Sequence, residues 1–167
     1  DYWNKVSKLS EHNLADLDQL IYESVLIKHD IVEQDPYETG MRKHLNFGHT
    51  LGHAIESYFL SHPDKEDLLH GEAIAVGMIL EGYLSAELLG LPKDDLEQIA
   101  KVIRNIYKPV AIDPSHYDSI IDLLKYDKKN EHGNINFVLL EAIGKPIRDC
   151  SVDNALIVKA FGFYSTL

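Results

Sequence analysis

Two histidines at helical spacing are the first residues in this sequence whose pattern suggests chemistry. His49 and His53 are four positions apart. On a helix such residues share one face, and their side chains can enter a common site. Imidazole is the commonest protein ligand for zinc and similar ions. The pair equally fits two surface or interface histidines, and it lacks the Glu that follows the first His in the metalloprotease motif.

The surrounding residues favour the metal interpretation. Gly48 and Gly52 flank the pair, which leaves room for a close ligand or a neighbouring helix. His70 opens the next expected helix, and an antiparallel return would bring it back toward His49. Two histidines from different helices plus an outside carboxylate make a three-ligand site that is open to water or substrate. The alternative for His70 is a helix-start histidine without a ligand role.

Positive charge is the second theme. Lys28, Arg42, Lys128 and Lys129 stand next to apolar or glycine-containing segments rather than in charge runs. Arg42 precedes the histidine helix, whose N-terminus attracts anions through its free N–H groups and dipole. Asn46 adds a donor and an acceptor. Together these residues predict a site that binds phosphate or carboxylate, although each lysine could also be an ordinary solvated side chain.

The elements that must position these residues are mostly helical. Periodicity and breaking residues predict a mainly α, multi-helix domain with a small β-hairpin near residues 134–150. Asn13 and Ser151 are the expected caps of the first and last helices. Glu56 and Glu81 are expected to face solvent or to pair with neighbours on their own helices. The helices are expected over 13–34, 48–60, 70–89, 93–106, 113–126 and 153–163, and the strands over 134–140 and 145–150.

Composition narrows the class of protein. The 167 residues suit a single domain over 1–167. The formal charge of −11 argues against nucleic acid or a membrane surface as the main partner, since both require a basic footprint. No apolar run is long enough to span a membrane, and no signal-peptide pattern opens the chain. The single cysteine, Cys150, fits a reducing compartment and is interpreted as structural. No phosphate-binding glycine loop or nucleophile elbow is present.

Longer stretches resemble a known family. Residues 45–56, Leu-Asn-Phe-Gly-His-Thr-Leu-Gly-His-Ala-Ile-Glu, are similar to a signature of the 3-dehydroquinate synthases, and so are residues 69–78, Leu-His-Gly-Glu-Ala-Ile-Ala-Val-Gly-Met. The approach from Lys28 to Arg42 and the segment over 127–144 also resemble this family. The similarity runs from about residue 20 to 145.

The resemblance implies an enzyme of the shikimate pathway, which leads to chorismate and the aromatic amino acids. Such enzymes convert 3-deoxy-D-arabino-heptulosonate 7-phosphate to 3-dehydroquinate and phosphate, using NAD transiently and one divalent metal, usually zinc. It implies a helical C-terminal domain here, a Rossmann-like NAD domain that is absent from this chain, a cytoplasmic location and a homo-oligomer. The partners are then the phosphorylated sugar acid and the chain's own N-terminal domain.

The motif match also implies residue roles. His49 and His70 would be metal ligands, while Lys28, Arg42, Asn46 and His53 would line the substrate site. One lysine of the pair Lys128 and Lys129 would join them. The third metal ligand of the family is a Glu that would lie before Asp1. We therefore expect the isolated chain to be inactive and to bind metal weakly.

Two other classes stay open at this point. A metal-dependent polyol dehydrogenase has a helical C-terminal domain of similar architecture, but a neutral polyol needs no phosphate-binding residues such as Arg42 and Asn46. A non-catalytic helical interaction domain predicts that loss of His49 or His70 leaves metal binding unchanged.

Overall fold

The computed structural model describes residues 3, 5, 8, 14–62, 68–126 and 135–167, and within them the chain is mainly α-helical, as predicted. The elements follow the expected order, with most ends within a few residues of the prediction. They are α2 (Leu14–Gln34), the 3₁₀ helix η2 (Met41–Asn46), α3 (His49–Leu60), α4 (His70–Leu89), α5 (Lys93–Ile106), η3 (Pro114–His116), α6 (Tyr117–Leu123), η4 (Leu124–Tyr126), β1 (Phe137–Ala142), β2 (Lys145–Cys150) and α7 (Asn154–Ser165).

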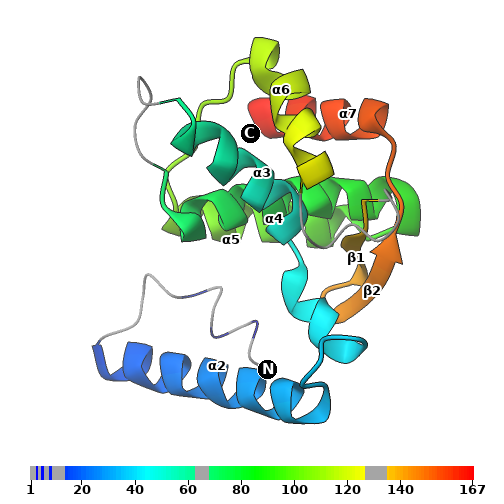
Figure 1. The fold of residues 1–167 in the computed structure, drawn as a ribbon. Helices are drawn as coiled ribbons and strands as arrows, with labels where there is room; N and C mark the ends of the chain where they lie inside the picture. Colours follow the sequence, from blue (N-terminus) through cyan, green and yellow to red (C-terminus); the bar gives the residue numbers. More distant parts are fainter. Residues whose placement is uncertain (1–2, 4, 6–7, 9–13, 63–67, 127–134) are drawn as a thin grey trace.

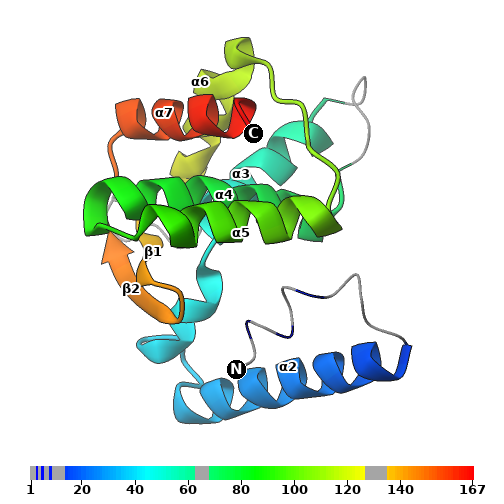
Figure 2. The same cartoon turned by 180° about the vertical axis from the view of Figure 1, so that it is seen from behind.

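Helix α4 is the centre of the domain. It packs against α3, α5, α7 and β1, so other elements cover it on several sides (Figures 1 and 2). One cluster of buried apolar side chains joins α4 to α3, α6, β1 and α7, and a second joins it to α5 and β1. A helix covered in this way is apolar around most of its circumference rather than along one stripe, and ten of its residues are buried.

The backbones of α3 and α4 touch where they cross. A Cβ built at Gly77 would overlap the carbonyl oxygen of Gly48 and lie 2.8 Å from the nitrogen of Gly52. A Cβ at Gly52 would lie 3.0 Å from the Cα of Ile74. Gly48 also has a φ of +82°, a conformation that favours glycine. The glycines therefore allow two antiparallel helices to approach at backbone contact.

The hairpin supports the segment that leads into α3. Strands β1 and β2 pair antiparallel, with Phe137 opposite Cys150 and Leu139 opposite Ile147. Both strands contact η2, and Lys43 Nζ lies 3.1 Å from Asp149 Oδ1. The predicted hairpin is confirmed, and it holds η2 beside the helical body.

Helix α2 lies apart from that body and joins it through η2 (Figures 1 and 2). The apolar periodicity correctly predicted the helix, yet Ile21 and Val25 are 62% and 58% exposed. In this structure the apolar stripe of α2 is thus largely open to solvent. None of the described helices is both long and apolar enough to cross a bilayer.

Two local predictions differ from the structure. The helix expected over 113–126 is divided into η3, α6 and η4, and it starts where Asp113 Oδ1 accepts a hydrogen bond from Ser115 N at 2.8 Å. The last helix is capped by Asp153, whose Oδ1 accepts from Leu156 N at 2.7 Å, and not by Ser151. Aspartate and serine are comparable N-caps. Residue type alone therefore could not decide between Ser151 and Asp153 as the cap of this helix. Asn13 lies outside the described residues.

The glycine crossing gives a stability prediction. Gly77→Ala must push α3 away from α4, because the new methyl group would meet backbone atoms that cannot rotate aside. We expect a loss of about 1–3 kcal/mol in the free energy of unfolding, measured by urea denaturation. Gly82→Ala is the control at another buried glycine of the same helix, since its methyl would meet only the end of the Leu96 side chain of α5, at 3.2 Å. Equal losses in the two variants would contradict the backbone-contact explanation.

Candidate metal and anion site

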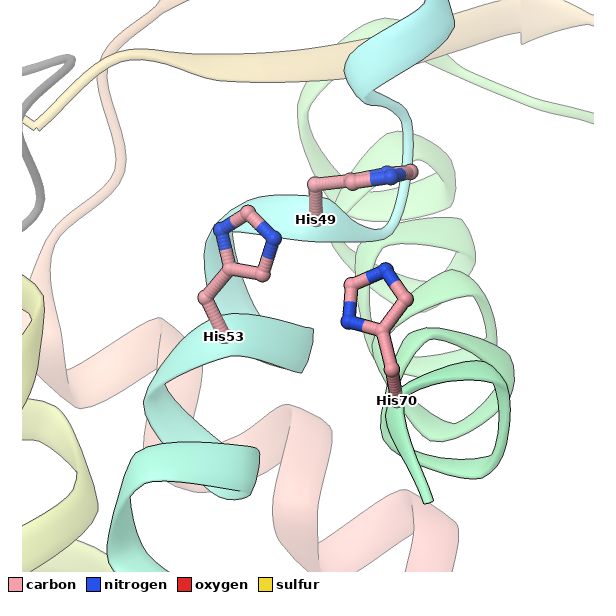
Figure 3. A group of neighbouring side chains, drawn as sticks. All are labelled: His49, His53 and His70. Carbon is pink, nitrogen blue, oxygen red and sulfur yellow. The ribbon is translucent and has the colours of Figure 1, made fainter.

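Three histidines converge at the start of α3 and α4. His49 and His53 extend from α3 and His70 from α4 into one space (Figure 3). Their ring centroids are 5.3, 6.0 and 5.6 Å apart for the pairs His49–His53, His49–His70 and His53–His70. The antiparallel return expected from the sequence therefore does bring His70 to His49. It brings His53 into the same cluster.

Hydrogen bonds fix which ring nitrogen can serve as a ligand in two of these residues. His49 Nδ1 lies 3.2 Å from the carbonyl oxygen of Phe47. His70 Nδ1 lies 3.1 Å from Glu56 Oε2. Both partners are acceptors, which favours the tautomer with the proton on Nδ1, and in that tautomer Nε2 is the ring nitrogen that would bind a metal. A carboxylate or carbonyl behind a ligating histidine is the usual orienting arrangement.

The donor set fits a divalent metal that prefers nitrogen ligands. One nitrogen from each ring can be chosen so that all three lie within 4.8 Å of one another. Tetrahedral zinc with bonds of about 2.0–2.1 Å needs ligand atoms roughly 3.3 Å apart, so small side-chain rotations would complete the site. His49 and His53 are partly buried and His70 is exposed, which leaves the cluster open on one side.

An open pocket adjoins the histidine cluster. Its lining includes Lys28 from α2, Arg42 and Asn46 from η2, and His49 from α3. Three residues assigned to the substrate site, Lys28, Arg42 and Asn46, thus line one cavity together with the predicted metal ligand His49. His53, assigned to the same substrate site, is not among the lining residues and lies in the histidine cluster instead. His49 belongs both to this pocket and to the histidine cluster, so a molecule in the pocket would lie beside a metal bound there.

Glu38 is a pocket residue to which the sequence analysis gave no role. Its Oε1 accepts a hydrogen bond from Asn46 Nδ2 at 2.6 Å, and its Oε2 lies 3.9 Å from Arg42 Nε. Its backbone has a φ of +56°, which is uncommon for a residue with a side chain. The carboxylate partly neutralises the cationic pocket, and an anion that binds there would compete with it for Arg42 and Asn46.

Asp35 organises the loop that carries Glu38 and Arg42. This carboxylate is buried, and it accepts backbone hydrogen bonds from Thr39 at 3.0 Å, Gly40 at 2.7 Å and Arg42 at 3.0 Å. Burial acts to raise the pKa of Asp35, but the three backbone donors outweigh it and the pKa is lowered below its usual value. The ionised side chain therefore fixes the entry to η2.

The contacts of Glu56 and Glu81 differ from those expected from the sequence. Glu56 contacts His70 on another helix instead of a neighbour on its own. The expectation for Glu81 was wrong, because this side chain is completely buried and accepts backbone hydrogen bonds from α3. The sequence held a signal, since Glu81 is the only charged residue between Glu72 and Glu87 in an otherwise apolar helix.

Three residues singled out in the sequence, Lys128, Lys129 and Cys150, do not contribute to the described site. Lys128 and Lys129 lie outside the described residues, so the lysine of the pair that would contact a substrate stays a prediction. Burial raises the pKa of the Cys150 thiol, which agrees with its interpretation as structural, because a high pKa disfavours the reactive thiolate.

Comparison with known proteins identifies the family. A family model described as "3-dehydroquinate synthase C-terminal" matches residues 1–130. The chain is 43% identical over 152 residues to 3-dehydroquinate synthase of Parabacteroides distasonis, covering 91% of this chain and 42% of that protein. It is 45% identical over 125 residues to the synthase of Streptococcus pyogenes serotype M49, covering 74% of this chain and 34% of the relative. The chain belongs to the 3-dehydroquinate synthase family and corresponds to its C-terminal domain, while spanning less than half the length of these relatives.

Solved structures share the fold. A 2-deoxy-scyllo-inosose synthase complexed with carbaglucose-6-phosphate, NAD⁺ and Co²⁺ matches with a TM-score of 0.72 and 27% identity, covering 89% of this chain and 41% of that one. ValA, a 2-epi-5-epi-valiolone synthase from Streptomyces hygroscopicus subsp. jinggangensis 5008 with NAD⁺ and Zn²⁺ bound, matches with a TM-score of 0.79 and 21% identity, covering 99% of this chain and 46% of that one. The fold is thus shared with synthases whose structures contain NAD⁺ and a divalent metal.

The lowered pKa of Asp35 gives a pH prediction. A carboxyl whose pKa is lower in the folded than in the unfolded state stabilises the fold above its unfolded value, about 3.9, and this contribution is lost as the pH falls through the folded value. We expect the amide protection factors of Thr39, Gly40 and Arg42 to fall over that acidic range. Asp35→Asn should lower them already at neutral pH, whereas Asp122→Asn, at an exposed carboxylate that pairs with Lys125, should not. Unchanged protection in Asp35→Asn would contradict the role of the carboxylate.

Proposed function

We propose that this chain is the C-terminal, metal- and substrate-binding domain of an enzyme that converts 3-deoxy-D-arabino-heptulosonate 7-phosphate to 3-dehydroquinate and phosphate. We also propose that this enzyme acts in the shikimate pathway, is located in the cytoplasm and forms a homo-oligomer. Its N-terminal partner domain would be the part of the relatives' length that this chain does not span.

One observation carries the proposal. His49 is shared by a cluster of three imidazoles and by a pocket that contains Lys28, Arg42 and Asn46. A metal site alone would suit many enzymes, and a cationic pocket alone would suit many anion-binding proteins. Their junction at a single side chain supports a substrate that carries an anionic group near a hydroxyl group that reacts.

The cofactors of the proposal are NAD and a divalent metal, zinc in the first instance. His49 and His70 would hold the metal, together with a carboxylate from outside the chain in the assembled enzyme. When bound, the metal would supply Lewis acidity and NAD would supply a hydride acceptor. The expectation that the isolated chain binds metal weakly was based on two nitrogen donors. His53 lies in the same cluster, but it is not assigned as a ligand here, so weak metal binding by the isolated chain stays a prediction.

The chain's own residues would bind and orient the substrate. Arg42 and Lys28 would hold its phosphate or carboxylate through charge-assisted hydrogen bonds, once the anion displaces Glu38 from Arg42 and Asn46. Asn46 can then donate to the substrate through its amide. His53 lies one helical turn beyond His49, and it is our candidate for proton transfer near the departing phosphate. Positioning and charge stabilisation are thus the contributions of this domain.

Two related reactions are the main rivals. A polyol dehydrogenase would use the histidines without the cationic pocket, and a cyclase of another phosphorylated sugar would use both. Glycerol and glucose 6-phosphate therefore belong in the same assay as the heptulosonate. Turnover of either, without turnover of the heptulosonate, would replace the proposed substrate.

The proposal predicts phosphate release by the full-length protein when it is supplied with 3-deoxy-D-arabino-heptulosonate 7-phosphate, NAD and zinc. Arg42→Ala should reduce kcat/KM at least about 100-fold, because it removes a charge-assisted contact to the substrate of about 3 kcal/mol. Lys43→Ala is the matched control, since this neighbouring cation pairs with Asp149 and does not line the pocket. Equal losses in the two variants, or no phosphate release by a folded and metal-loaded parent, would overturn the proposal.

The metal site makes a separate prediction. His49→Ala and His70→Ala should each weaken Co²⁺ or Zn²⁺ binding at least about 10-fold, measured by competition with a chelator, because each removes a direct ligand. His116→Ala is the control, because this histidine packs against Tyr58, with the ring centroids 5.3 Å apart, and does not belong to the cluster. His53→Ala should abolish turnover by the full-length enzyme while changing its metal affinity less than His49→Ala does. A metal loss in His53→Ala as large as in His49→Ala would make His53 a ligand instead.

A further inference from the structure

Glu81 is a completely buried carboxylate that is neither a lining residue of the pocket nor a member of the group of candidate metal ligands. Its side chain extends from the middle of α4, one helical turn beyond Gly77, where α4 meets the backbone of α3. Burying a carboxylate is costly unless it is paired or hydrogen-bonded. A position of this kind in an otherwise apolar helix therefore calls for a specific partner.

The partners of Glu81 are the first backbone amides of α3. Glu81 Oε2 accepts from Gly48 N at 2.6 Å, and Oε1 accepts from Leu51 N at 3.1 Å. The first N–H groups of a helix have no partner within it, and no side chain of the preceding residue caps α3. A side chain from another helix thus supplies the N-terminal cap that α3 lacks locally.

The two bonded amides lie on either side of His49. Holding Gly48 and Leu51 fixes the first turn of α3 on α4, and that turn carries His49, with His53 one turn further on. His70 begins α4, the helix that carries Glu81 itself. The two hydrogen bonds thus join the helix that carries His70 to the turn that carries His49.

We propose that Glu81 is a positioning residue for the metal site, which holds the start of α3 so that His49 and His53 face His70. The proposal rests on the metal site of the proposed function. A carboxylate suits this place because it can accept from both amides and because negative charge is favoured at a helix N-terminus. A glutamine of the same volume has one acceptor oxygen, and its NH₂ group would face a second donor.

Ser85 provides a matched comparison within the same helix. It lies one turn beyond Glu81, is also completely buried, and its Oγ accepts from Leu140 N of β1 at 2.9 Å. Each residue therefore satisfies a backbone amide of a neighbouring element. Only Glu81 holds the element that carries metal-binding histidines.

The test compares Glu81→Gln, Ser85→Ala and His49→Ala in the full-length protein. Co²⁺ affinity is measured by chelator competition and thermal stability by calorimetry. Both buried-residue variants should lose stability. Glu81→Gln should also weaken Co²⁺ binding by about 10–100-fold, the range for residues that orient ligands, whereas Ser85→Ala should stay within about 3-fold of the parent. The Co²⁺ absorption spectrum of Glu81→Gln should shift, since the geometry of its ligands changes.

Each outcome decides between separate claims. Unchanged Co²⁺ affinity in folded Glu81→Gln, with a large loss in His49→Ala, overturns the positioning role and leaves the metal site intact. Unchanged affinity in His49→Ala overturns the metal site itself. If Glu81→Gln does not fold, Glu81→Asp replaces it, because the shorter side chain keeps the charge but cannot reach both amides. Failure of both variants to fold, while Ser85→Ala folds, overturns the proposal in favour of a general role in stability.

Discussion

The contact between the backbones of α3 and α4 is the constraint on which the rest of the site depends. Gly48, Gly52 and Gly77 remove the side chains that would hold the helices apart, and Glu81 joins the start of one helix to the middle of the other. Close-packed interiors transmit small displacements. A shift of α3 along α4 would therefore move His49 and His53 together relative to His70. It would increase the distances between the ring nitrogens of the cluster although the three histidines themselves are unchanged.

The site joins residues of the packed helical core to residues that lie outside it. The three histidines come from two helices packed in the core, whereas Lys28 lies on α2, which reaches the body through η2. Between these parts, Asp35 ties the loop that leads into η2, and the hairpin supports η2 from the other side. The position of the pocket relative to the histidine cluster therefore depends on how η2 is held.

The sequence indicated the elements and the chemical types well, because both follow from local patterns. Periodicity, prolines and glycines placed the helices, and the spacing of His49 and His53 indicated their shared face. What it did not indicate depends on contacts between distant residues. Glu81 was expected to face solvent or to pair with helix neighbours, whereas its partners are about thirty positions away in the sequence. Glu38 and Glu56 were missed in the same way, since a carboxylate gains its role from whichever donor the fold brings near it.

The glycine crossing has a consequence for how this sequence can diverge. Gly48, Gly52 and Gly77 are needed for the approach of two backbones, and this need persists whatever the histidines do. A lineage that abandons the reaction could therefore lose His49 or His70 in single steps while keeping the glycines around them. Conversely, a change at one glycine cannot be repaired by a change at another, because each faces main-chain atoms. In this segment the helix packing thus restricts substitution whether or not the histidines keep a chemical role.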